Sequence, residues 1–313
     1  MRGLALVTGG AGFIGSHLVK QLIKEGYNVR VFDNLSRTKN NIEELKEMKK
    51  VEFIQGDIRD KEAVAKSMKD VDYVFHEAAI CLNKAKKFPE EAIDVNLKGS
   101  FNIFTAAIKN KVKKIIYAST SSVYGQPNYL PIDEKHPKNC KTPYESTKLC
   151  AEHMLKFLAG QSETRYIILR YFNVYGKRQS TDAYYTSVIN IFIKKILAGE
   201  SPKIHGKGTQ SMDFTHVSDV VSANIVALKR EISGEVFNVC KGEENTIKSI
   251  AEFIISKLNS ELKPEFIERD VFVTRRKGDN TKLKETLGYT PKITLQEGLA
   301  ELIEDVKANP DLY

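Results

Sequence analysis

The first 26 residues constrain the fold of this chain more than any other segment. The run LALVTGGAGFIGSHLVKQLIKEG begins with a short apolar stretch, passes through glycines, and continues with Ile14, Leu18 and Leu22 at a spacing of four. That spacing is typical of one face of a helix, and Gly26 follows as a stop signal. The sequence therefore predicts a strand, a glycine turn and a helix in direct succession.

The glycines of this turn stand where a dinucleotide-binding turn requires missing side chains. Gly9, Gly12 and Gly15 would permit a tight bend, close approach of the backbone to a pyrophosphate, and close packing of helix on strand. The N–H groups and the dipole at the start of the helix favour a phosphate anion. The next strand, NVRVFD, ends in Asp33, 18 residues after Gly15. A carboxylate there accepts hydrogen bonds from ribose hydroxyls and repels a 2′-phosphate, which favours NAD over NADP, although Arg37 lies close by.

Strand and helix patterns alternate over the first 170 residues. Apolar runs predict strands at LALVT, NVRVF, VEFIQ, DYVFH, KKIIYAS and YIILRYF. Helices are expected between them, including 13–25, 61–69, 90–109 and 144–159. Such alternation predicts a Rossmann-type α/β fold, with a doubly wound parallel sheet and helices on both faces. Ligands bind such sheets at the carboxyl ends of the strands, where the polar residues Asp57, His76, Ser119 and Thr120 fall.

Beyond Gly176 the regular alternation fades. Glycines and prolines separate shorter segments, among which we expect a helix near 217–230, a strand near 235–240, and helices near 246–258 and 295–307. The pattern predicts a smaller C-terminal α/β substrate domain that closes over the sheet ends. We expect residues 1–170 to form the NAD-binding domain and 171–313 mainly the substrate domain, with about 212–240 returning to the first.

Composition excludes several classes of protein. The 42% apolar and 28% charged content is typical of a soluble globular chain, and no run of 18 apolar residues or signal peptide is found, so we expect no membrane association. The four cysteines are scattered, which favours reduced thiols in the cytoplasm over a disulfide or metal framework. The net charge of +8 comes from lysines interspersed with glutamates, which suits an anionic small substrate better than a nucleic acid.

The run PYESTK pairs a phenol with an ammonium group one helical turn apart. Tyr144 and Lys148 would lie on one face of a helix, where the charge favours the ionised phenol. Because a free tyrosine has a pKa near 10, a base that works near neutrality needs a depression of roughly 3 units, about 4 kcal/mol. From the spacing alone, the commoner alternative is a half-buried ring beside a solvated lysine.

Ten motifs, taken in order, resemble the extended short-chain dehydrogenase/reductase family, and within it the NAD-dependent sugar-nucleotide epimerases of the UDP-glucose 4-epimerase type. They are TGGAGFIGSH, DNLS, GDIRD, HEAA, DVNLKGSFN, YASTSSVYG, YESTK, RYFNVYG, QSMDFTHVSDV and LGYTP. The resemblance covers nearly the whole chain.

The resemblance implies a tightly bound NAD that is regenerated in each turnover. It places at the cofactor Gly9, Gly12, Phe13, Ile14, Gly15, Asp33, Asn34, Ser36, Asp57, Ile58, Ala78, Ala79, Asn96, Tyr144, Lys148 and Phe172. The implied catalytic set is Thr120, Tyr144 and Lys148, in which Thr120 hydrogen-bonds the reacting sugar oxygen and Lys148 holds the nicotinamide ribose. A strand-end hydroxyl such as that of Thr120 can instead cap local backbone, and His76 is expected to make structural hydrogen bonds only.

The substrate residues are where the chain departs from the resemblance. Asn173 is expected to bind the substrate diphosphate, but Met212 stands where family members often carry an arginine. The missing charge has candidates in Arg275 and Arg276, or in Lys177 and Arg178. The residue that gates the sugar pocket has no clear counterpart.

The predicted function is NAD-dependent C4 epimerisation of a nucleotide sugar through a transient 4-keto intermediate, with UDP-glucose/UDP-galactose or an N-acetyl analogue as substrate. Alternatives are another sugar-nucleotide oxidoreductase or epimerase, such as a 4-ketoreductase or uronate epimerase, and a non-catalytic dinucleotide sensor. Ser121 and Ser122 stand where related 4,6-dehydratases carry an Asp-Glu pair, and Asp33 disfavours the NADPH exchange of a reductase. The resemblance also implies a homodimer formed through helices near 96–109 and 144–159.

Overall fold

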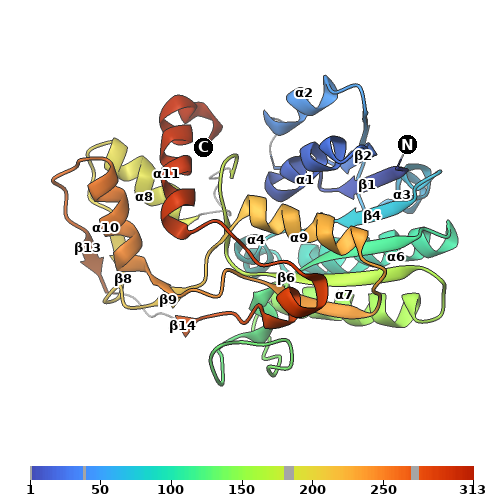
Figure 1. Ribbon diagram of the computed structural model, residues 1–313. Coiled ribbons are helices and arrows are strands. Elements are labelled where there is room, and N and C mark those ends of the chain that lie inside the picture. The colour runs from blue at the N-terminus through green and yellow to red at the C-terminus, as the bar shows by residue number, and fades with distance from the viewer. Residues whose placement is uncertain (1, 38–39, 180–186, 269–274) are drawn as a thin grey trace. The chain divides into compact units, whose positions relative to one another are not determined.

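The computed structural model describes residues 2–37, 40–179, 187–268 and 275–313, and they form two compact units (Figure 1). Unit 1 comprises Met1–Val123, Cys140–Arg170 and Val221–Phe237. Unit 2 comprises Tyr124–Asn139, Tyr171–Val220 and Asn238–Tyr313. The chain thus passes between the units several times, and residues 124–139, expected in the first domain, cluster with unit 2.

The segment 124–139 belongs to unit 2 because its polar groups bond there. The Tyr124 hydroxyl donates to Asn238 Oδ1 at 2.7 Å, and Asn238 Nδ2 donates to the Ile132 carbonyl at 2.9 Å. The Ile132 N–H in turn donates to the Lys277 carbonyl at 2.8 Å. These partners lie far from residues 124–139 in the sequence, so no local sequence pattern predicts the contacts.

A seven-stranded sheet forms the centre of unit 1, in the order β11-β6-β5-β4-β1-β2-β3. Its strands are β1 (Leu4–Thr8), β2 (Asn28–Asp33), β3 (Val51–Gln55), β4 (Tyr73–His76), β5 (Lys114–Thr120), β6 (Arg165–Tyr171) and β11 (Glu235–Val239). The pairings from β3 through β2, β1 and β4 to β5 are parallel, which confirms the Rossmann-type sheet. Chain order reverses between β1 and β4, and ligands of doubly wound sheets bind at such a switch point.

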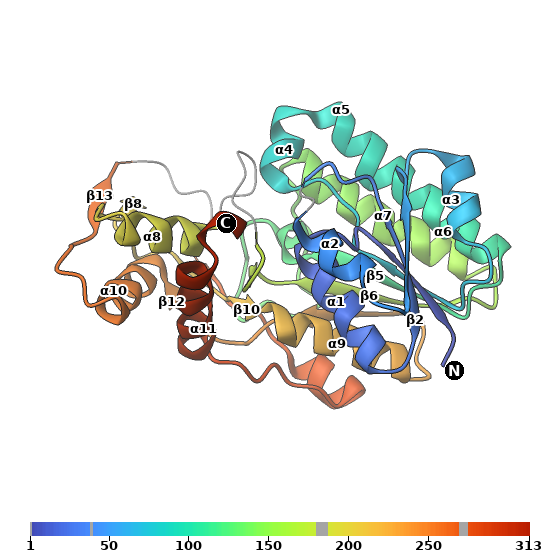
Figure 2. The ribbon, with the colours of Figure 1, turned by 90° about the horizontal axis from the view of Figure 1, so that it is seen from above.

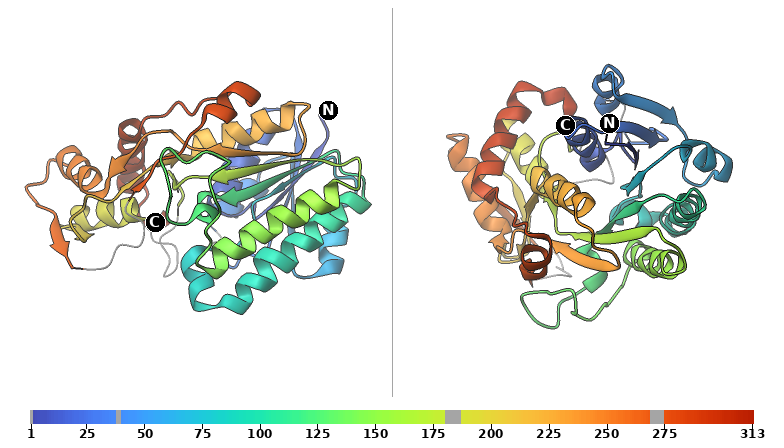
Figure 3. Two further views of the ribbon diagram at one scale, coloured as in Figure 1. Left: turned by 90° about the horizontal axis from the view of Figure 1, so that it is seen from below. Right: turned by 45° about the vertical axis from the view of Figure 1, so that its right-hand side comes forward.

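Helices cover both faces of this sheet (Figure 2). They are α1 (Phe13–Lys24), α2 (Asn40–Lys46), α3 (Lys61–Ser67), α4 (Leu82–Lys87), α5 (Pro89–Ala92), the π-helix η1 (Ile93–Gly99), α6 (Ser100–Lys109), α7 (Pro143–Ala159) and α9 (Val217–Lys229). Helices α1 and α9 lie on one face, where Lys229 pairs with Glu25 at 2.7 Å. Helices α6 and α7 run side by side on the other face (Figure 3). The expected helix 90–109 is therefore α5, η1 and α6 in succession, and α2 and α4 were not expected.

Unit 2 combines short strands with four helices in its described residues. The strands pair as β7 (Val174–Tyr175) with β10 (Thr215–His216), β8 (Lys203–His205) with β13 (Glu265–Ile267), and β9 (Ser211–Met212) with both β12 (Asn245–Thr246) and β14 (Arg275–Arg276). The helices are α8 (Val188–Leu197), α10 (Ile247–Lys257), the π-helix η3 (Leu283–Leu287) and α11 (Leu295–Ala308). Short 3-10 turns are η2 (Ser121–Tyr124) and η4 (Pro310–Leu312).

The core of unit 2 lies among α8, α10 and α11. Phe192, Ile193, Ile254 and Leu302 are among its buried side chains. Within the described ranges, no helix is long and apolar enough to cross a membrane.

Candidate active site

The backbone of the turn between β1 and α1 makes contacts so close that only glycine fits at those positions. Gly9 has φ of +69°, a left-handed conformation that favours glycine. A Cβ on Gly15 would lie 2.2 Å from the Gly9 carbonyl oxygen, and one on Gly9 would lie 2.8 Å from the Ala78 nitrogen. Gly12 precedes the first turn of α1 without a side-chain cap, and that turn holds no acidic residue. The first N–H groups of α1, around Phe13 and Ile14, therefore suit an anion.

Asp33 ends β2 at the same edge of the sheet. Its Oδ2 accepts from the Ala11 N–H at 3.0 Å, and its Oδ1 accepts from the Leu35 N–H at 2.8 Å. Burial raises the pKa of this carboxyl above its ordinary value, and these two hydrogen bonds oppose that effect. The backbone thus fixes the carboxylate beside the glycine turn.

A second carboxylate, Asp57, follows β3. Arg59 donates to both of its oxygens, Nε at 2.9 Å and Nη2 at 2.7 Å, and Asn34 Nδ2 donates at 2.8 Å. These bonds, the Arg59 bond first, lower the pKa of Asp57 to about 2. Asn34 Oδ1 also accepts from the Ser36 N–H at 3.0 Å. Asp57, Arg59, Asn34 and Ser36 are thus linked by hydrogen bonds, and the Asp57 carboxyl is ionised near neutral pH.

The segment after β4 carries Ala78 and Ala79, and Asn96 of η1 holds it in place. Asn96 Oδ1 accepts from the Ile80 N–H at 2.9 Å, and its Nδ2 donates to the Ile80 carbonyl at 3.3 Å and to Thr147 Oγ1 at 3.4 Å. The Asn96 amide thus bonds protein groups, and its contact with NAD stays a prediction. Ile58 packs against Gly99, where a Cβ would lie 2.6 Å from its side chain.

Helix α7 begins with a capping box that sets the position of Tyr144. Thr142 accepts from the Glu145 N–H at 3.4 Å, while the Glu145 carboxylate accepts from the Thr142 N–H at 3.0 Å. Pro143 occupies the first helical position, so Tyr144 lies in the first turn. Burial raises the pKa of the Tyr144 phenol to about 12, and the Thr120 side chain, at the carboxyl end of β5, opposes this effect. The Thr120 hydroxyl oxygen itself accepts from the Ser122 N–H at 3.1 Å.

Lys148 is buried one turn further along α7. Its Nζ lies 4.4 Å from the centre of the Tyr117 ring. Burial lowers the pKa of Lys148 to about 8, and the carboxylates of Glu77 and Glu152 oppose this. Desolvation dominates at the Tyr144 phenol and the Lys148 ammonium lies over the Tyr117 ring, so the lowering of the Tyr144 pKa by Lys148 stays a prediction.

Phe172 and Asn173 follow β6 in unit 2. Phe172 is fully buried, with its ring centre 6.4 Å from that of Tyr124. Asn173 Nδ2 donates to the Asp213 carbonyl at 2.8 Å. Asp213 in turn accepts from the N–H groups of Lys241, Gly242 and Gly278 at 3.0, 2.9 and 3.2 Å. Asp213, which the sequence did not single out, thus ties three segments of unit 2 together.

The candidate cations of unit 2 differ in their surroundings. Arg276 is buried and its Nη2 donates to the Gly125 carbonyl at 3.0 Å. Arg275 is exposed and makes two bonds to Glu244, at 2.8 and 2.6 Å. The N–H of Arg178 donates to the Tyr313 hydroxyl at 3.1 Å, and Lys177 pairs with Glu301 at 3.1 Å. Arg275 and Lys177 are therefore engaged in surface ion pairs.

Unit 1 also contains polar contacts that motif reading missed or left without a role. His76 lies between Thr8 Oγ1 at 2.7 Å and Ser100 Oγ at 2.8 Å, which agrees with a structural role. Glu152 and Arg170 form a buried ion pair that also includes Ser119. Two signals pointed to the pair: Glu152 continues the four-residue spacing of Tyr144 and Lys148, and Arg170 interrupts the apolar run YIILRYF.

Comparisons with known proteins agree with this geometry. The sequence model of the NAD dependent epimerase/dehydratase family matches residues 5–240. A putative UDP-glucose 4-epimerase of Methanocaldococcus jannaschii is 39% identical over 98% of this chain and 99% of its own. A UDP-N-acetyl-alpha-D-glucosaminuronate decarboxylase of Bacillus cytotoxicus is 35% identical over 97% and 98%. The crystal structure of a UDP-glucose 4-epimerase with UDP-glucose, from Thermotoga maritima, matches with a TM-score of 0.92 at 35% identity, covering 98% and 99% of the two chains.

Proposed function

This chain belongs to the NAD-dependent epimerase/dehydratase family, and we propose that it interconverts the C4 epimers of a nucleotide sugar through a transient 4-keto sugar. The observation that carries the proposal is that Tyr144 and Lys148 lie one turn apart in α7, with the Thr120 side chain near enough to the phenol to lower its pKa. A hydroxyl, a phenol and an ammonium group in this arrangement suit proton exchange at a sugar hydroxyl. The putative UDP-glucose 4-epimerase and the UDP-glucose 4-epimerase structure described above support the same reaction.

The cofactor of this family is NAD, and the residues of unit 1 fit it. A Cβ on Gly9 or Gly15 would collide with backbone atoms, and one on Gly12 would lie 3.1 Å from the Gly9 carbonyl oxygen, so this tight turn suits close approach to a pyrophosphate. Asp33 would accept from the adenosine ribose, and Lys148 would hold the nicotinamide ribose. When bound, NAD would supply the hydride chemistry at C4 of the sugar.

Tyr144 acts as the proton-transfer group. As a phenolate it takes the proton of the C4 hydroxyl, and it gives the proton back after the keto sugar has turned in its pocket. Burial raises the pKa of the phenol to about 12, so a positive charge nearby, which the oxidised nicotinamide would supply when bound, would favour the ionised form. Thr120 donates to the same sugar oxygen and keeps it aligned with Tyr144.

Unit 2 supplies the residues that bind the nucleotide diphosphate. Asn173 is held by the Asp213 carbonyl, and Arg276 brings a buried guanidinium. Arg178 is a further candidate, while Arg275 has its guanidinium engaged by Glu244.

Other reactions on this scaffold fit less well. Ser121 and Ser122 lack the acid and base that elimination of water would need. Asp33 opposes the repeated NADPH exchange of a 4-ketoreductase. A sensor without catalytic activity has no use for Thr120, Tyr144 and Lys148 together. The matched decarboxylase acts on a uronic acid by its name, so a uronate substrate belongs in the test.

The test is to incubate the purified protein with UDP-glucose, UDP-galactose, their N-acetyl analogues and UDP-uronic acids, without added cofactor. We expect C4 epimers in the NMR spectrum, formed with the NAD that the protein retains. A reduced product that requires NADPH, or loss of carbon dioxide from a uronate without an epimer, would contradict the proposal. Tyr144→Phe is the matched inactive control.

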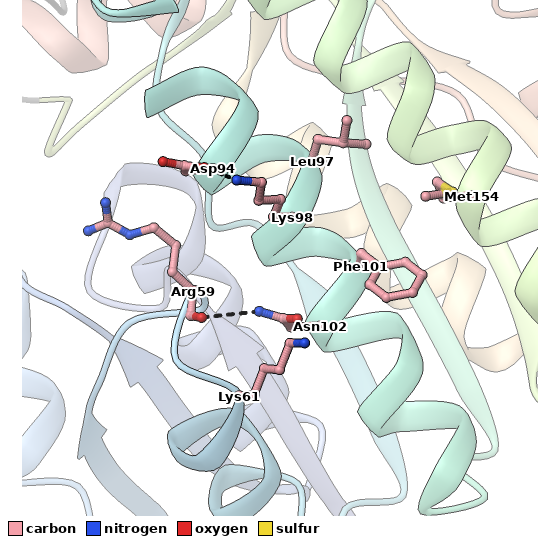
Figure 4. A pocket seen from close by; sticks show the side chains of 8 residues that line it. All are labelled: Arg59, Lys61, Asp94, Leu97, Lys98, Phe101, Asn102 and Met154. Carbon is pink, nitrogen blue, oxygen red and sulfur yellow. Dashed lines mark hydrogen bonds and ion pairs between the residues drawn. The ribbon is translucent and has the colours of Figure 1, made fainter. Parts of the chain in front are cut away.

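We also propose that the protein is a cytoplasmic homodimer built on α6 and α7. A pocket of about 510 Å³ lies beside these helices, with Leu97 of η1, Phe101 of α6 and Met154 of α7 as its apolar lining (Figure 4). Arg59, Lys61 and Lys98 supply its charged rim. Phe157, three residues after Met154 on α7, is 63% exposed. Two copies of the protein that met at this face would bury each other's apolar side chains.

The four cysteines are free thiols, which suits the reducing environment of the cytoplasm.

Sedimentation of Phe157→Glu tests the dimer. We expect the wild type to sediment as a dimer and the variant as a monomer. The matched control is Phe266→Glu, which changes a phenylalanine that is 51% exposed in unit 2 and should leave the dimer intact. A monomeric wild type, or loss of the dimer in the control alone, would contradict the proposed surface.

A further inference from the structure

Glu152, Arg170 and Ser119 form a closed polar cluster inside unit 1. Arg170 Nε donates to Glu152 Oε1 at 2.9 Å, and Arg170 Nη2 donates to Oε2 at 2.6 Å. The Ser119 hydroxyl donates to Oε1 at 2.5 Å. Glu152 is 0% exposed and Arg170 3% exposed, so both charges are removed from water. A carboxylate that accepts two hydrogen bonds from one guanidinium, in a bidentate contact, has a fixed orientation.

This cluster joins the three elements that carry or flank the reacting groups. Glu152 belongs to α7 and lies four residues after Lys148 and eight after Tyr144, on the same face of the helix. Ser119 precedes Thr120 in β5. Arg170 belongs to β6, the neighbour of β5 in the sheet. The ion pair therefore ties α7 to the sheet within one or two turns of the phenol.

Stability alone is a weak reason for such a pair. The cost of taking two charges out of water commonly offsets their attraction, and apolar side chains of similar volume often serve as well or better. Apolar contacts, however, permit a helix to slide or rotate slightly, whereas the paired oxygens and nitrogens permit one register only. A displacement of about 1 Å at a reacting group costs on the order of 10²-fold in rate.

We propose that Glu152 and Arg170 are positioning residues, which fix the rotation and axial position of α7 so that the Tyr144 phenol keeps its place relative to Thr120. This inference rests on the proposed function. The Glu152 carboxylate has a second effect, since it helps Lys148 to stay charged against the desolvation that lowers its pKa. Tyr144 and Thr120 do the chemistry, and the buried pair holds them in register.

The test replaces the pair by apolar residues in the double variant Glu152→Met/Arg170→Met. We expect it to fold with a melting temperature near that of the wild type, while kcat falls at least tenfold and KM changes less than threefold. The control is Lys114→Met, which removes another buried cation of unit 1, one that donates to the Ala227 carbonyl at 2.8 Å and lies away from α7. Its kcat should stay within twofold of the wild type.

A folded double variant with kcat within twofold of the wild type would overturn the positioning role, as would an equal loss of kcat in Lys114→Met. If the double variant does not fold, Ser119→Ala decides the matter, because it removes only the hydroxyl bond to Glu152. We then expect a severalfold loss of kcat at unchanged KM, and an unchanged kcat would overturn the role.

A readout independent of turnover separates this inference from the proposed function. Amide hydrogen exchange at residues 145–148 should be at least tenfold faster in the double variant than in Lys114→Met. If the wild type epimerises none of the nucleotide sugars, the proposed function fails and the exchange rates still judge the positioning role. Equal exchange in the two variants would overturn it.

Discussion

Arg276 lies directly beside Met212 in the three-stranded sheet of unit 2, because β14 pairs with β9 in parallel with these two residues in register. The position that often carries an arginine in related enzymes thus has a buried guanidinium as its neighbour. Arg275, one residue earlier, is exposed and bound to Glu244. The two arginines form a natural matched pair for testing where the diphosphate binds.

The first prediction concerns this pair. Arg276→Gln should raise KM for the nucleotide sugar at least tenfold and leave kcat within about threefold, since a lost charge-assisted bond weakens ground-state and transition-state binding alike. Arg275→Gln should change both constants less than twofold. Steady-state kinetics and calorimetric titration with UDP measure the effects. If both substitutions changed KM to the same extent, the diphosphate would have to bind in another part of unit 2.

The second prediction concerns proton transfer by Tyr144. Tyr144→Phe should reduce turnover by about 10² or more while NAD stays bound, because it removes the exchanging proton and little volume. More than about a tenth of the wild-type turnover in this variant would contradict the role of the phenol. Retention of NAD, measured from the extracted nucleotide, is the control for an intact site.

The third prediction concerns the pH dependence of turnover. The reaction needs the phenolate, so kcat/KM should rise with pH below the pKa of Tyr144. The Thr120 hydroxyl lowers that pKa, and its removal in Thr120→Val should shift the rising limb to higher pH. Thr120→Ser keeps the hydroxyl and should keep the wild-type profile. Coincident profiles for the three proteins would show that Thr120 does not act on the phenol.

The sequence predicts the sheet and the glycine turn well because their signals are local. Apolar runs define β1 to β6, and the contacts that exclude a Cβ at Gly15 involve residues within the same turn. The position of the Asn96 side chain could not be predicted from the sequence as well, because its hydrogen-bond partners depend on the π-helix η1 and on Ile80. The π-helical turn at η1 interrupts a pattern that otherwise reads as one continuous helix.

The pKa of Tyr144 could not be derived from spacing for a similar reason. The four-residue interval places Lys148 on the right face of α7, but the depth of burial decides the balance of charge and desolvation. That depth depends on the packing of α7 against the sheet, to which Glu152 and Arg170 contribute. Only the fold brings these residues, 18 positions apart, into contact.

The fourth prediction concerns stability at low pH. His76 is fully buried between Thr8 and Ser100, and burial holds its pKa well below 6.5. As the pH falls below 6.5 the unfolded chain binds a proton at this ring and the folded chain does not, so the free energy of unfolding decreases. Above 6.5 both states are neutral there and the contribution is constant.

His76→Gln should remove that part of the pH dependence. Urea unfolding at about pH 5.5 and pH 7.5, where a free histidine is largely protonated and largely neutral respectively, measures it. The wild type should lose more stability between the two values than the variant, although the variant is less stable at both because its amide fits the two hydroxyls less well. Equal losses in the two proteins would mean that His76 takes up its proton in the folded state.

The last prediction concerns the glycine turn. In Gly15→Ala the new Cβ meets the Gly9 carbonyl oxygen at 2.2 Å and the Gly10 Cα at 2.8 Å, and these are backbone atoms that can move only if the turn opens. Because an opened turn directs its N–H groups away from a pyrophosphate, we expect NAD affinity to fall by about 10² or more. The control is Gly199→Ala, where φ is +75° but no atom lies within 4 Å of the added Cβ. That variant should lose about 1 kcal/mol of stability from its left-handed backbone and bind NAD as the wild type does. Calorimetric titration with NAD and urea unfolding separate the two effects, and full NAD affinity in Gly15→Ala would exclude this turn as the pyrophosphate site.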